Sequence, residues 1–144
     1  MSATYRPITT GCRSRTQHQR QWLGSITRAV SALHNDLHLT VAGTVPNQHR
    51  LSCYGQARAG VFFGDGYRCV STGATGLFRI GPPALSDAIG NVDQHNDLTQ
   101  GPPAAGEGAV IAGSRWFFRY WYRGTGPSLN HFNLSNCLDI RFVP

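Results

Sequence analysis

One segment, residues 114–123, limits the possible folds more than any other part of the chain. It reads Ser-Arg-Trp-Phe-Phe-Arg-Tyr-Trp-Tyr-Arg. Successive side chains of a β-strand point to opposite faces of the sheet. A strand here therefore places only large aromatic side chains on one face, and we interpret that face as part of a hydrophobic core. Its members are Trp116, Phe118, Tyr120 and Tyr122.

The opposite face of the same strand alternates guanidinium groups with aromatic rings. Side chains of these two kinds bind anions and stack on sugar rings or nucleic-acid bases. We favour a solvated face in which the arginines lie over their aromatic neighbours, and a ligand-binding surface is the alternative. The candidate residues are Arg115, Phe117, Arg119, Trp121 and Arg123.

The rest of the chain predicts short strands joined by turns, because 17 glycines and 8 prolines interrupt it at short intervals. Leu37, Leu39 and Val41 alternate with polar residues, which is typical of a half-buried strand that ends at Gly43. The other predicted elements are a hairpin of 61–63 and 67–70 about Gly64-Asp65-Gly66, a strand 77–80 stopped by Gly81-Pro82-Pro83, a weak strand 92–98, and a last strand 138–142.

About seven strands at roughly ten-residue spacing favour an all-β fold, an antiparallel β-sandwich of the jelly-roll or immunoglobulin type. A chain of 144 residues fits one domain. We assign residues 25–144 to that domain and residues 1–24 to a polar, poorly ordered N-terminal lead-in. The predicted core is Leu39, Val41, Val61, Phe63, Trp116, Phe118, Tyr120, Tyr122, Leu138, Ile140 and Phe142.

The segment from Trp22 to Leu37 has two interpretations. Apolar residues recur there every three to four positions, which predicts an amphipathic helix over residues 21–34. The alternation of Ile26, Arg28 and Val30 also fits a strand.

The charge of the chain favours an acidic partner. Its formal net charge is +6, and all 13 basic residues are arginines, whose planar groups suit phosphate, sulfate and carboxylate. An anionic polysaccharide or another cell-surface component is one expectation, and nucleic acid is another.

No apolar run approaches the roughly 20 residues of a membrane span, so no membrane insertion is predicted. Residues 1–20 lack the apolar core of a secretory signal, which leaves a cytoplasmic location open.

The four cysteines, Cys12, Cys53, Cys69 and Cys137, lack the spacing of a zinc site. They allow two disulfides in three connectivities, and free buried thiols are an equal alternative.

Residues capable of catalysis or metal binding do not form a recognisable set. His34 and His38 would share a face only on a helix, whereas residues 37–41 predict a strand. The aspartates Asp87, Asp93 and Asp97 lack the pattern of a calcium loop. There is no Gly-x-Ser-x-Gly elbow and no glycine-rich phosphate loop. We therefore predict a non-enzyme without cofactor or metal, and rank a hydrolase last.

Three segments carry a resemblance to a known group. They are Phe63-Gly64-Asp65-Gly66-Tyr67-Arg68-Cys69-Val70, the run Trp116 to Arg123, and Phe132-Asn133-Leu134-Ser135-Asn136 with the closing Arg141-Phe142-Val143-Pro144. In this order they resemble the C-terminal domain of a large group of uncharacterised secreted proteins from planctomycetes and myxobacteria. The resemblance runs from about Gly24 to Pro144.

This resemblance implies an all-β fold, a strand rather than a helix over residues 25–30, and a secreted or cell-surface location. The resemblance brings no known activity, cofactor or site. Our leading hypothesis is a non-catalytic role in attachment, surface architecture or glycan contact. The alternative, suggested by the net charge and the arginine–aromatic face, is an intracellular nucleic-acid-binding domain. The chain departs from the group at Gly124, Cys137 and Val143, where the group has aspartate, glycine and cysteine. The group carries Asn and Gln where this chain has Phe117 and Arg119, so the arginine face is not implied by the resemblance.

Overall fold

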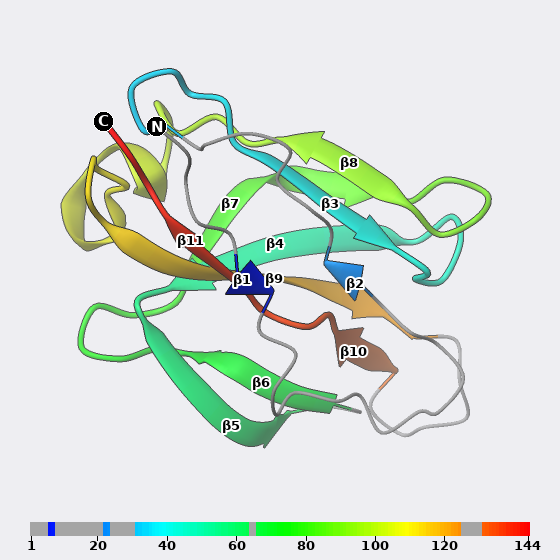
Figure 1. The fold of residues 1–144 in the computed structure, drawn as a ribbon. Helices are drawn as coiled ribbons and strands as arrows, with labels where there is room; N and C mark the ends of the chain where they lie inside the picture. The colour runs from blue at the N-terminus through cyan, green and yellow to red at the C-terminus, as the bar shows by residue number, and fades with distance from the viewer. Residues whose placement is uncertain (1–5, 8–21, 24–30, 64–65, 125–130) are drawn as a thin grey trace.

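A computed structural model covers the chain, and it describes all residues except 1–5, 8–21, 24–30, 64–65 and 125–130. The described residues form antiparallel β-strands and two short 3-10 turns (Figure 1). The strands are β1 (Arg6–Pro7), β2 (Trp22–Leu23), β3 (His38–Ala42), β4 (His49–Gly55), β5 (Ala57–Phe63), β6 (Gly66–Ser71), β7 (Phe78–Leu85), β8 (Val92–His95), β9 (Arg115–Arg123), β10 (Phe132–Leu134) and β11 (Leu138–Arg141). The turns are Pro102–Ala104 and Gly106–Gly108.

These strands form three sheets in layers. The central sheet has six strands in the order β1-β11-β9-β4-β7, with β10 beside β9. A three-stranded sheet, β2-β3-β8, lies on one side of it, and the β5–β6 hairpin lies on the other (Figure 1). We call the face of the central sheet toward β3 and β8 the inner face, and the face toward the hairpin the outer face. The predicted all-β antiparallel sandwich is confirmed.

The main core fills the space between the central sheet and β3–β8. Leu39 and Val41 from β3 contact the cluster of Trp116, Phe118 and Tyr120 from β9, and all five are fully buried. Leu138, Ile140 and Phe142 belong to the same cluster, and Tyr122 is buried as well, so nine of the eleven predicted core residues are buried. Val61 and Phe63 are the two errors. They remain 46% and 43% exposed because the hairpin packs through Cys69 and Val70 of β6 rather than through the end of β5.

Strand β7 continues through the predicted stop at Gly81-Pro82-Pro83. Between the pairs Arg50↔Ala84 and Ser52↔Ile80, one residue of β4 faces these three residues of β7. The proline-containing stretch is thus an irregularity in an edge strand, where a missing backbone N–H costs no ladder hydrogen bond. Gly81 has φ 68°, and a side chain there would approach Gln94 Nε2 to 2.9 Å.

The predicted helix over residues 21–34 is wrong where the structure describes that segment. Trp22–Leu23 pairs with β3, and the chain turns after Ser31. The backbone N–H of Ser31 donates to Asp36 Oδ1, and its hydroxyl accepts from the N–H of Leu33. The alternative strand over residues 25–30 lies outside the described residues. Two dipeptides of the predicted lead-in are described, and these, β1 and β2, pair with β11 and β3.

Candidate functional site: the arginine-rich outer face

The five candidate residues of β9 lie together on the outer face of the central sheet. Register places Cys53 of β4 opposite Arg119, and Arg79 of β7 opposite Cys53. Arg141 of β11 lies opposite Arg115, with Asp139 opposite Phe117. Because paired residues of neighbouring strands point to the same face, these side chains extend the face across four strands.

The prediction that this face is solvated is wrong at its centre. Phe117 and Arg119 are buried because the β5–β6 hairpin covers them, and Phe117 shares a cluster with Cys69, Val70 and Cys137. Arg119 Nη2 donates to the carbonyl of Ser135 at 2.5 Å. Arg115 and Arg123 remain exposed, whereas Trp121 is half-buried.

Two features hold the hairpin on the outer face. A disulfide joins Cys69 of β6 to Cys137, just before β11, and closes a sequence separation of 68 residues. The backbone also approaches closely at Gly55, where an added Cβ would lie 2.8 Å from the carbonyl oxygen of Ser71. The sequence left the disulfide pairing open, and the structure selects this one. Cys53 is a free thiol, and Cys12 lies outside the described residues.

The rim of the face combines cations with aromatic rings. The guanidinium of Arg115 forms a bidentate ion pair with the carboxylate of Asp139, and its carbon lies 5.5 Å from the centre of the Phe117 ring. That hydrogen-bonded carboxylate raises the pKa of Arg115. Arg58 of the hairpin lies over the same ring at 5.9 Å. The buried phenylalanine is thus flanked by two cations at the surface.

A second aromatic group continues from β9 to the hairpin. Trp121 contacts Phe132 of β10 with ring centres 5.8 Å apart, and Phe132 contacts Phe63 of β5 at 5.3 Å. Arg68 lies over the Phe63 ring at 5.7 Å. The candidate Trp121 is therefore part of a composite surface. The sequence had assigned Phe63 to the core and had given Arg68 and Phe132 no role.

Charge is strongly segregated among the described side chains. Seven of the eight arginines whose side chains the structure describes lie on the outer face or on the hairpin, namely Arg58, Arg68, Arg79, Arg115, Arg119, Arg123 and Arg141. Only one of the six described acidic residues, Asp139, lies there. Four others, Asp36, Asp87, Asp93 and Asp97, lie in β8 or in the loops next to β3 and β8. Among the side chains that the structure describes, the two sides therefore present opposite charge.

The eighth arginine, Arg50, is fully buried on the inner face. Its guanidinium donates to Thr44 Oγ1, Ser86 Oγ and the carbonyl of Val45, and it lies 5.1 Å from the centre of the Tyr122 ring. Burial lowers the pKa of this group. The hydrogen bonds tie the loop after β3 to the end of β7, so Arg50 stabilises the fold rather than contributing to the arginine-rich face.

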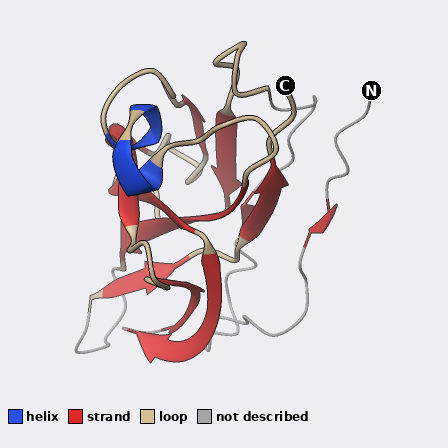
Figure 2. Cartoon of the chain, turned by 90° about the vertical axis from the view of Figure 1, so that its left-hand side faces the viewer, coloured by secondary structure: helices blue, strands red, loops and turns tan. Residues whose placement is uncertain are grey.

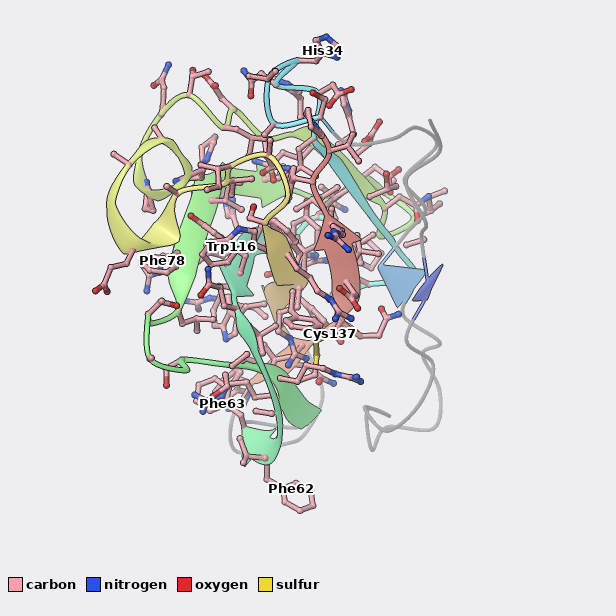
Figure 3. The ribbon with its side chains drawn as sticks, turned by 60° about the vertical axis from the view of Figure 1, so that its left-hand side comes forward. His34, Phe62, Phe63, Phe78, Trp116 and Cys137 are labelled. Atoms are coloured by element: carbon pink, nitrogen blue, oxygen red, sulfur yellow. A yellow bond between two sulfur atoms is a disulfide. The ribbon has the colours of Figure 1, made fainter. Side chains whose placement is uncertain are left out.

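Several histidines and aspartates lie around β3 and β8, at the end of the molecule away from the β5–β6 hairpin (Figure 3). Figure 3 shows His34 at one end and Phe62, near the tip of the hairpin, at the other. His38 begins β3, so it does not share a helical face with His34, and its Nδ1 lies 3.6 Å from Asp93 Oδ1. Among the described residues, no three His, Cys, Asp or Glu side chains group as a metal site would require.

The three aspartates considered for calcium have separate local partners. Asp87 accepts hydrogen bonds from the backbone N–H groups of Ile89 and Asn91. Asp97 accepts from the hydroxyl and N–H of Thr99, and these bonds lower its pKa. Asp87 and Asp93 line an open hollow of about 670 Å³ between β3, β7 and β8, and Asp97 does not.

Comparison with known proteins adds no relative. No family model, no curated protein and no solved structure matches the chain. None of the helical turns in the described part of the chain has the length and apolar character needed to cross a membrane. The two turns lie together at one side of the sandwich (Figure 2).

Proposed function

We propose that this chain is a non-catalytic β-sandwich module of the secreted or cell-surface space that attaches to acidic polysaccharide through its outer face. Charge segregation carries the proposal. Arginines gather where the aromatic rings are exposed, while most acidic residues lie on the other side of the sandwich. A polyanion is attracted to one face and repelled by the other, which orients it before contact.

The disulfide supports the extracellular part of this proposal. Bonds of this kind persist in oxidising compartments and are rare in the cytosol. Cys69–Cys137 is also placed where it maintains the proposed binding face, because it joins the hairpin to the segment before β11.

The proposal is tested with heparin as a sulfated polysaccharide and dextran as a neutral one, each at about 50 and 200 mM salt. We expect heparin alone to bind, and to bind more weakly at the higher salt concentration. The double variant Arg79→Gln/Arg141→Gln removes two exposed outer-face charges and should weaken binding by about 3- to 5-fold.

A matched control lowers the net charge equally at the other side. Asn47→Asp/Gln100→Glu alters two exposed residues away from the outer face and should leave heparin affinity within about 2-fold. Equal weakening by both double variants would show attraction to net charge alone and contradict an oriented face. Tighter binding of a single-stranded oligonucleotide than of heparin would favour the nucleic-acid alternative instead.

A further inference from the structure

We infer that Trp121, Phe132 and Phe63, with Arg68 and Arg123, form a subsite for an acidic sugar unit, a uronate or a sulfated pyranose. The inference rests on the proposed function and assigns it a specific place. The aromatic rings receive the C–H face of the sugar, and the two guanidinium groups pair with its carboxylate or sulfate. We call these five residues the aromatic subsite.

The geometry of the subsite brings both kinds of contact together. The three rings are in series, with centre-to-centre distances of 5.8 and 5.3 Å. Arg68 flanks the Phe63 end at 5.7 Å from the ring centre. Arg123 is exposed and lies opposite Phe132 in the β9–β10 register. One cation therefore accompanies the Phe63 end of the ring series, and a second lies opposite its middle ring, Phe132.

Exposure distinguishes this group from ordinary core packing. Phe63 is 43% exposed, and Trp121 and Phe132 are only half-buried, whereas every ring on the inner face of β9 is buried. The exposed apolar area continues along β5 to Val61. Apolar surface left in water beside cations suits a partner with an apolar face and negative charge.

Acidic sugars have that combination, because their ring C–H groups and their charged substituents belong to the same unit. A polyanion without rings would contact only the arginines, and a neutral sugar would contact only the aromatic rings. Charge complementarity with the arginine-rich face therefore selects an acidic saccharide.

The subsite is assembled from β9, β10 and the hairpin, so it depends on the position of the hairpin. Arg68 immediately precedes Cys69, whose disulfide to Cys137 holds β6 against the outer face. Phe63, with Arg68 over its ring, contacts Phe132 only while the hairpin stays there. We expect loss of the disulfide to weaken the subsite without altering the Trp121–Phe132 contact.

The experiment compares two polyanions by titration calorimetry on the full chain. Alginate is a polyuronate, and inorganic polyphosphate is a polyanion without sugar rings. Phe63→Ala and Phe132→Ala should each weaken alginate binding by about 3- to 10-fold and leave polyphosphate binding within about 2-fold. The control Ile89→Ala removes an apolar side chain that is 72% exposed in the turn between β7 and β8, and should alter neither.

The outcomes separate the subsite from the proposed function. If alginate binding is unchanged in both phenylalanine variants, or if polyphosphate weakens equally, the subsite is wrong although the outer face still binds polyanions. If neither polymer binds the unaltered protein, both proposals are overturned. A thermal melt accompanies each variant, and Phe63→Ala keeps the test valid should Phe132→Ala lower the melting temperature, because Phe63 is the more exposed of the two.

Discussion

Both faces of β9 are covered, but by different parts of the protein and through different interactions. The inner face carries Trp116, Phe118, Tyr120 and Tyr122, all buried against the β3–β8 side of the sandwich. The outer face buries Phe117 and Arg119 at its centre and leaves arginines at its rim. Aromatic packing covers the first face, while a small hairpin held by a disulfide covers the second.

This difference assigns the two faces different roles: the inner face stabilises the fold, and the rim of the outer face is available for contact with partners. The inner face excludes water over a large apolar area, which is the main favourable contribution to folding. The outer face is covered only in part, and its rim keeps cations and rings at the surface. We therefore expect substitutions on the inner face to lower the free energy of unfolding, and substitutions at the outer rim to alter binding with little loss of stability.

The largest effect is expected for Phe118→Ala. The Phe118 ring is fully buried and stacks on Tyr54 at 5.3 Å. Its removal leaves a cavity, and the free energy of unfolding should fall by about 3–5 kcal/mol, measured by urea denaturation. The matched change Phe63→Ala at the outer rim should cost less than about 1.5 kcal/mol. Equal losses for the two variants would contradict the division between the faces.

The next effect concerns the hairpin. The double variant Cys69→Ser/Cys137→Ser should lose about 2–4 kcal/mol, because a closed loop of 68 residues no longer restricts the unfolded chain. Amide hydrogen exchange should rise most in β5 and β6 and least in β3 and β8. Cys53→Ser is the control, since that thiol is free. An equal rise in β5–β6 and in β3–β8 would show that the hairpin is not a separate cover.

Alternation predicted strands whose buried face is apolar and missed β4, whose buried face mixes polar and aromatic side chains. β3, β9 and β11 were expected because their inward residues are hydrophobic. β4 lies between β9 and β7, and its inward side chains are Arg50, Ser52 and Tyr54, while Leu51 and Cys53 turn outward and stay half-buried. Its apolar residues therefore do not follow the alternation that predicts a strand, and the burial of Arg50 depends on hydrogen bonds to residues outside the strand that no local pattern reveals.

The candidate site was predicted only in part, because alternation shows which face a side chain lies on and not what packs against that face. Alternation placed Arg115, Arg119 and Trp121 on one face correctly. It could not show that a hairpin predicted elsewhere in the chain would pack on that face and bury Phe117 and Arg119, because such packing depends on long-range contacts. Four cysteines in three possible connectivities gave no means of selecting the disulfide that holds this arrangement.

Alkaline pH should weaken the inner face selectively. Burial raises the pKa of the Tyr54 and Tyr120 hydroxyls above the ordinary value of 10.0, and these groups donate to the carbonyls of Gly108 and Leu39. Their folded-state pKa exceeds the unfolded one, so this stability is complete below about pH 10 and is lost as the pH rises.

Each tyrosine should lower the free energy of unfolding by about 1.4 kcal/mol per pH unit above that point. Urea denaturation between pH 8 and 11 measures the slope, and Tyr54→Phe should reduce it. A slope unchanged by Tyr54→Phe would show that other groups cause the loss.

The last prediction concerns the reactivity of the Cys53 thiol on the outer face. It tests whether burial under the hairpin or the charge of the neighbouring arginines has the larger influence on that reactivity. Burial raises the pKa of this thiol, whereas the positive charges of Arg79 and Arg119 lower it, and burial is the larger influence. Alkylation by iodoacetamide at about pH 8, followed by peptide mass mapping, should be at least about 10-fold slower in the folded protein than in urea. Faster alkylation in the folded protein would mean that the arginine charges dominate and that the hairpin covers this part of the face poorly. The slow reaction we expect follows from an outer face that is closed at Arg119 and open to partners only at its rim.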